Sequence, residues 1–139
     1  MKHVLKLLEM AIQEAQKSTM LYRHSAILFN RNNIYGCAHN YSVHNFLQAS
    51  IHAEMASICA HKLRLHKIKK YDILVTRLTA NGKLTYSRPC QHCFDVLRKM
   101  GVRRIYYSDF TGDIICEKIA QMNSQKLCVS SGTRFRRKH

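Results

Sequence analysis

The sequence lacks a long apolar run, an internal repeat and a low-complexity linker. A membrane-spanning helix needs about 18 consecutive apolar residues, so none is predicted. Because no linker divides the 139 residues, we expect one domain, at residues 1–132, followed by a basic tail at residues 133–139. Hydrophobic residues make up 46% of the chain, which excludes an intrinsically disordered protein.

A secretory signal peptide is not predicted either, because Lys6 and Glu9 interrupt the apolar residues of the sequence MKHVLKLLEM. We therefore expect a soluble protein in the reducing interior of the cell, in the cytoplasm, with the nucleus as the alternative. Six cysteines would form three disulfides in a small secreted protein, but reduced thiols are favoured here, some of them bound to metal. Four of them are interpreted as small hydrophobic core residues: Cys37, Cys59, Cys116 and Cys128.

Acidic residues are scarce, with eight Asp and Glu against 23 Lys and Arg, for a formal net charge of +15. The basic residues concentrate at residues 61–70 and in the C-terminal sequence RFRRKH. An isolated basic cluster is usually solvated surface. An excess over the whole chain attracts polyanions, and it favours a nucleic acid or a phosphorylated substrate as the partner.

The order of periodic segments predicts an α/β fold. Helical spacing of apolar residues indicates helices at residues 3–17, 51–65, 90–100 and 113–122. Strands are expected in a hairpin at residues 25–40, and at residues 72–79, 103–109 and 126–130. Since strands alternate with helices in the later part, we expect a three-layer α/β/α sandwich with a mixed, mostly parallel five-stranded sheet.

Two cysteines follow the single proline, in the sequence SRPCQHC at residues 87–93. At the start of a helix, Cys90 and Cys93 would lie on one face, and the helix dipole favours their thiolate form. Two thiolates at this spacing are a common half of a zinc site. Redox proteins share the motif, but there it follows the first strand of a βαβ unit. A second C-x-x-C is absent, which excludes a four-cysteine zinc ribbon.

A third metal ligand is expected from the sequence SIHAEMAS at residues 50–57. His52 is distinguished among nine histidines by Glu54, an acid that could handle protons beside a bound metal. The alternative interpretation of Glu54 is an acid that stabilises the helix dipole. Three protein ligands would leave one position for water, as catalytic zinc sites do.

Together the sequences HAE and PCQHC match the pattern H-x-E…P-C-x-x-C of zinc nucleobase deaminases. Over residues 20–110 the chain resembles the zinc-dependent cytidine and deoxycytidylate deaminase-like superfamily. The resemblance implies that His52, Cys90 and Cys93 bind one zinc ion per chain. It also implies that Glu54 transfers protons from a zinc-bound water, whose pKa zinc lowers to roughly 7.

The resemblance implies substrate contacts as well. Asn40, in the sequence GCAHN, is similar to an asparagine that holds the substrate sugar, although a plain turn asparagine is the alternative. The backbone near Ala53 and Cys90 is expected to help orient the base. His24 stands where relatives often carry a histidine, and its role is left open.

Weaker signals in the sequence indicate which base is deaminated and whether it belongs to a nucleotide or to a nucleic acid. The filler residues Gln91 and His92 differ from those common in tRNA adenosine deaminases, and the next residues resemble nucleotide-type enzymes, which favours cytosine. The net charge favours a phosphate-bearing substrate, either dCMP or CMP or a single-stranded RNA or DNA. Five rings are candidates to stack on the bases of a strand, most of them also expected in the core: Tyr41, Phe46, Tyr86, Tyr106 and Tyr107.

Two other functions are kept open. One is an adenosine deaminase acting on nucleic acid, and the other is a non-catalytic, zinc-stabilised nucleic-acid-binding module. Glu54 distinguishes the second, because a structural zinc has little need of a carboxylate beside an open position. Family members usually form dimers or higher oligomers, so a homo-oligomer is expected, although strong like charge opposes self-association.

Overall fold

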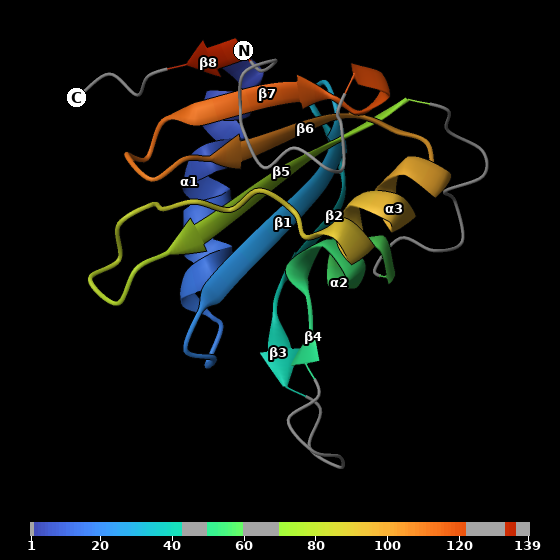
Figure 1. The fold of residues 1–139 in the computed structure, drawn as a ribbon. Helices are drawn as coiled ribbons and strands as arrows, with labels where there is room; N and C mark the ends of the chain where they lie inside the picture. The colour runs from blue at the N-terminus through green and yellow to red at the C-terminus, as the bar shows by residue number, and fades with distance from the viewer. Residues whose placement is uncertain (1, 43–49, 60–69, 122–132, 136–139) are drawn as a thin grey trace.

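The computed structural model describes residues 2–42, 50–59, 70–121 and 133–135. Its centre is a sheet of six described strands in the order β2-β1-β5-β6-β7-β8 (Figure 1). The strands are β1 Arg23–Asn30, β2 Asn33–His39, β5 Tyr71–Leu78, β6 Val102–Ser108, β7 Ile114–Lys118 and β8 Thr133–Phe135. A separate two-stranded ladder joins β3 Tyr41–Ser42 to β4 Ser50–Ile51.

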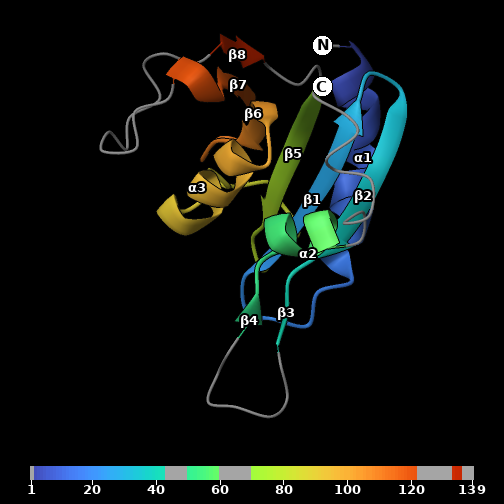
Figure 2. The ribbon, with the colours of Figure 1, turned by 90° about the vertical axis from the view of Figure 1, so that its right-hand side faces the viewer.

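Three α-helices of the described residues cover the sheet: α1 Lys2–Gln16, α2 Ala53–Cys59 and α3 Gln91–Lys99. Helix α1 packs on one face, and α2 and α3 pack on the other (Figure 2). Alternate residues of β1 serve the two cores, since Ala26 and Leu28 point toward α2 and α3 whereas Ile27 and Phe29 point toward α1. The predicted three-layer α/β/α sandwich with a mixed sheet is confirmed. None of the described helices is long and apolar enough to span a membrane.

The strand directions differ from the prediction, because the sheet is mostly antiparallel. Among the described strands only β5 and β6 form a parallel pair. The helix predicted at residues 113–122 was wrong: Ile114–Lys118 is strand β7, antiparallel to β6, and only Ile119–Gln121 form a short 3₁₀ turn. A hairpin turn before β7, with Gly112 at φ 87°, reverses the chain and makes this pairing antiparallel.

The other predicted elements are confirmed within the described residues. Helix α2 starts at Ala53, two residues after its predicted start, and the rest of the predicted helix lies outside the described residues. The strand expected at residues 126–130 also lies outside them. Residues Thr133–Phe135, expected at the start of the basic tail, pair with β7 as strand β8. The division into a domain and a tail stays a prediction.

Glycine at position 36 lets α2 lie directly on β2. A Cβ atom at this position would lie 2.3 Å from the backbone carbonyl oxygen of Ser57, which is closer than van der Waals contact allows. The absence of a side chain therefore sets the distance between the hairpin and the helix whose first residues border the candidate site.

Candidate metal centre and active site

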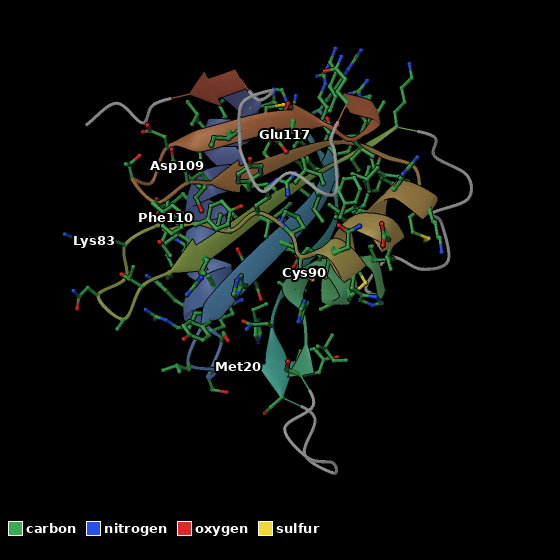
Figure 3. All side chains as sticks on the ribbon, in the orientation of Figure 1. Met20, Lys83, Cys90, Asp109, Phe110 and Glu117 are labelled. Carbon is green, nitrogen blue, oxygen red and sulfur yellow. The ribbon has the colours of Figure 1, made fainter. Side chains whose placement is uncertain are left out.

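Two helix N-termini meet at the candidate metal centre. His52 immediately precedes α2, and its carbonyl oxygen accepts the N–H of Ala56 in the first helical turn. Cys90 is the N-cap residue of α3, with extended backbone at φ −67° and ψ 166°, and Cys93 lies in the first turn. Figure 3 shows Cys90 at the start of α3, close to α2.

The three predicted ligands converge. The Nδ1 atom of His52 lies 3.2 Å from the Sγ atom of Cys93 and 3.7 Å from that of Cys90. All three ligand atoms lie within 4.8 Å of one another, which is the spacing of donors around one metal ion. Within the described residues, this is the only group of three or more such side chains that could hold a metal.

The donor set fits zinc. One imidazole and two thiols are soft or borderline ligands, and this combination leaves a fourth tetrahedral position open. Cys93 is buried, and burial raises the pKa of its thiol, with further contributions from the nearby Glu54 and Cys90. A divalent cation would favour the thiolate and remove the repulsion between these groups.

Glu54 lies beside these ligands, in the first turn of α2. Its side chain is buried, with 5% of its surface exposed. Burial raises the pKa of the Glu54 carboxyl, and the nearby backbone N–H and His52 offset this only in part. The carboxyl group therefore binds a proton more readily than an exposed glutamate does.

A cavity of about 240 Å³ opens above the centre, and His52, Glu54 and Cys90 form part of its wall. Ala53, which is fully buried, and Asn40, which is 7% exposed, also line it. The structure therefore brings all six predicted site residues to one place, since Cys93 lies within reach of His52.

Asn40 also positions the start of β1. Its Oδ1 atom accepts the backbone N–H of His24 at 2.9 Å, and its Nδ2 atom donates to the carbonyl oxygen of Tyr22 at 2.7 Å. The hydroxyl of Ser18 donates to the carbonyl oxygen of Asn40. His24, whose role the sequence left open, lines the cavity, and burial lowers the pKa of its imidazole.

Five further residues that sequence reasoning did not identify also line the cavity: Met20, Tyr22, Ser50, Ser87 and Arg88. The Nε atom of Arg88 donates to the Oε2 atom of Glu117 at 3.3 Å, and both side chains are almost fully buried. Arg88 directly precedes the proline of the cysteine motif, and this adjacency is the signal that could have identified it.

The candidate stacking rings fall into different environments. Tyr106 and Tyr107 are buried in the two cores, and Tyr86 stacks on Phe110 with ring centroids 4.8 Å apart. Tyr41 is 47% exposed, and Phe46 lies outside the described residues. Cys37 and Cys116 are half-buried free thiols, whereas the side chains of Cys59 and Cys128 are outside the part of the chain that the structure describes.

The fold and the metal centre together define a class of zinc-binding deaminase domains. The family model of the cytidine and deoxycytidylate deaminase zinc-binding region matches residues 1–109. The chain belongs to this family. Comparison with curated protein sequences gives no match.

Solved structures of deaminases share the fold. The chain is similar to the cytidine deaminase of Burkholderia pseudomallei, at 17% identity and a TM-score of 0.63, over 84% of this chain and 92% of that one. For the cytidine deaminase of Mycobacterium leprae the identity is 17%, the TM-score 0.59 and the coverage 85% and 94%. For the dCMP deaminase of cyanophage S-TIM5, in complex with dCMP and dUMP, these values are 16%, 0.53, 78% and 80%.

Proposed function

We propose that the protein is a zinc-dependent hydrolytic deaminase that converts a cytosine base to uracil and releases ammonia. The observation that carries the proposal is the convergence of His52, Cys90 and Cys93 within 4.8 Å at a cavity that Glu54 also lines. One zinc ion per chain would be held by these three side chains. Bound there, zinc would supply the Lewis acidity that lowers the pKa of a coordinated water to roughly 7.

In this proposal Glu54 moves the protons. Its carboxylate accepts a proton from the attacking water and passes it to the ring nitrogen next to the reacting carbon. It then delivers a proton to the exocyclic amine, which leaves as ammonia, so one water is consumed for each ammonia released. The burial of Glu54 suits this role, since a dry carboxyl group holds a proton more readily between the two transfers.

We further propose that the substrate carries phosphate. The supporting observations are the net charge of +15 and the guanidinium group of Arg88, which Glu117 holds in the cavity wall. The cyanophage neighbour, which binds dCMP and dUMP, is consistent with a cytosine nucleotide. Asn40 and the backbone of Ala53 are the proposed contacts to the sugar and the base.

Substitution of Glu54 tests the chemistry separately from the metal. Glu54→Gln keeps the size and the three ligands but cannot accept a proton, so zinc content should be unchanged. Ammonia release should fall about 10²–10⁴-fold, the usual contribution of a general acid–base group. Zinc is measured by elemental analysis, and ammonia by a coupled assay.

Two outcomes would contradict the proposal. A Glu54→Gln variant with full activity would exclude Glu54 as the proton carrier. A wild-type protein that binds zinc but deaminates none of cytidine, deoxycytidine, CMP, dCMP, adenosine, guanine, single-stranded DNA and tRNA would be a non-catalytic zinc-stabilised module. Product mass in the same panel identifies the base and its carrier.

A further inference from the structure

We call the cavity lined by His52, Glu54 and Cys90 the catalytic cavity. A second pocket lies at the opposite end of the sheet. It is formed where β1 turns into β2 and where β5 and β6 begin, and its volume is about 580 Å³. His24, in the catalytic cavity, and Asn30, in this pocket, are separated along β1 by roughly 20 Å at a rise of about 3.3 Å per residue. A mononucleotide in one site therefore does not reach the other.

The walls of this second pocket are strongly basic. Its charged residues are Arg31, Lys70, Asp72, Arg103 and Arg104, with His3 beside them, and we call it the basic pocket. Four permanent cations thus face one carboxylate. That carboxylate is nearly buried, at 4% exposed, and lies 3.3 Å from the Nη2 atom of Arg103, whose own side chain is 39% exposed. The buried acid therefore holds one guanidinium in place while leaving part of it accessible to an anion.

The basic pocket is suited to phosphate and not to a base. The side chains that line it are all polar or charged, unlike the mostly hydrophobic and aromatic lining of a typical pocket for an organic ligand. Its one ring, that of His3, already packs edge-on against Phe29. Lys70 is also the last residue of the basic stretch of the sequence at residues 61–70.

We propose that the basic pocket binds backbone phosphates of a single-stranded nucleic acid, independently of the catalytic cavity. Cationic side chains that neutralise phosphates release bound counterions, so affinity depends steeply on salt. Because this binding needs neither zinc nor Glu54, it goes beyond the proposed deaminase activity and can be measured without turnover.

The test removes the charges of Arg31 and Lys70, two exposed side chains of the basic pocket. Arg31 is exposed and has a positive φ of 54°, a conformation that asparagine tolerates, and Lys70 is also exposed. The Arg31→Asn/Lys70→Gln variant keeps the contact between Asp72 and Arg103. Binding of a fluorescent oligothymidylate is followed by anisotropy between about 50 and 200 mM salt. Thymine lacks an exocyclic amine, so the probe is not a deaminase substrate.

For single strands each phosphate contact contributes about 0.7 to the slope of log affinity against log salt. Loss of two contacts should lower the slope by about 1.4 and weaken binding about twentyfold near 0.1 M salt. If the double variant does not fold, Lys70→Gln alone should lower the slope by about 0.7. An unchanged slope and affinity would overturn the proposal.

A charge-matched control is available at the other end of the sheet. Lys17 follows α1, with its side chain 64% exposed, and Lys83 is exposed in the connection after β5 (Figure 3). The Lys17→Gln/Lys83→Gln variant should keep most of the affinity. An equal loss in both double variants would show that only net charge matters, and would overturn the assignment to the pocket.

Pyrophosphate at matched ionic strength serves as a competitor. It should displace the strand only weakly, because it replaces a small part of an extended run of phosphates. Complete displacement at equal phosphate concentration would assign the pocket to small phosphate compounds and overturn the proposed strand. The Glu54→Gln variant should bind the strand as the wild type does, so failure of the deaminase proposal would leave this result unaffected.

Discussion

Cys93 occupies the most protected position among the three candidate metal ligands. Its side chain is fully buried, whereas Cys90 and His52 are exposed. Burial raises the pKa of the Cys93 thiol, so this group keeps its proton at neutral pH unless a metal ion displaces it. Ionisation of the Cys93 thiol therefore depends on a bound metal ion.

We expect Cys93→Ser to lose its zinc during dialysis against a chelator, because a serine hydroxyl is a poor ligand for zinc. The loss of affinity should exceed the roughly 10–100-fold that follows removal of a partner beyond the ligands. Zinc is measured by elemental analysis after dialysis against a chelator. The control is Cys116→Ser, a half-buried thiol on β7, which should keep its zinc; equal zinc loss in both variants would exclude a specific role for Cys93.

The sequence predicted the side chains that belong to a spaced motif and missed those that do not. His52, Glu54 and the cysteines could be identified because their chemistry requires fixed residue types at fixed positions. Tyr22 and Arg88 border the same cavity through chain folding alone, and no spacing relates one to the other. The hydrogen bonds of Asn40 to the start of β1 also depend on the register of the hairpin, which composition does not determine.

At the scale of the elements, the contact between β2 and α2 controls the position of Glu54. The methyl group introduced by Gly36→Ala would meet the backbone carbonyl of Ser57, which cannot rotate away. We expect a loss of about 1–3 kcal/mol in the free energy of unfolding. Displacement of α2 by about 1 Å should also lower turnover about 10²-fold. Chemical denaturation and initial rates measure the two effects.

Gly82→Ala provides the control for Gly36→Ala. Gly82 has φ 81°, and a methyl group added there would have no neighbouring atom within 4 Å, so alanine costs about 1 kcal/mol of backbone strain without moving α2. Its turnover per folded molecule should equal that of the wild type. Equal losses of turnover in both variants would show that the activity follows global stability and not the position of α2.

Helix α1 is joined to β2 through Glu14, which gives a pH-dependent contribution to stability. Burial alone would raise the pKa of this carboxyl, but hydrogen bonds from His39 at 2.5 Å and Lys17 at 3.1 Å outweigh it and lower the pKa. Since the folded pKa lies below the unfolded one, the contribution is complete above the unfolded pKa. It is lost as the pH falls through the folded pKa.

We therefore expect Glu14→Gln to be less stable than the wild type at pH 7 and to approach it in acid. Urea unfolding midpoints, measured from neutral pH down to below the usual carboxyl range, would reveal this convergence. A constant difference between the two proteins at every pH would mean that packing, and not the ionised carboxylate, accounts for the effect.

The predicted elements were correct where the period of apolar residues is unambiguous. The apolar residues of helix α1 recur with the 3.6-residue period of a helix. Strand β5 is instead a short run of almost entirely buried residues. Strand β7 was predicted as a helix because its few apolar residues fit either period. Ile114 and Ile115 are in fact buried in different cores, one on each face of the sheet, and this two-sided burial becomes visible only once β6 lies beside them.

At the scale of the whole molecule, the C-terminal residues combine a structural and a charged segment. Residues Thr133–Phe135 pair with Ile114, Ile115 and Cys116 of β7. A chain that ends at residue 132 would leave β7 as an edge strand with unpaired backbone groups. We expect it to lose about 1–3 kcal/mol of unfolding free energy, for a few lost hydrogen bonds.

A chain that ends at residue 135 keeps the strand and loses only the sequence RRKH. Its stability should stay within about 0.5 kcal/mol of the full chain, as for most surface changes. Comparison of the two truncated chains by urea unfolding separates the two contributions. Equal stability of both would show that β8 contributes nothing to the sheet.

The three candidate ligands come from two segments, His52 before α2 and the cysteine pair at the start of α3, about forty positions apart in the chain. Neither segment alone offers more than two of the donors. During refolding, the three donors can meet only after both helices have docked on the sheet. Unlike a zinc finger, whose short peptide is organised by its ion, this domain must assemble first, so metal uptake should be the last event to finish.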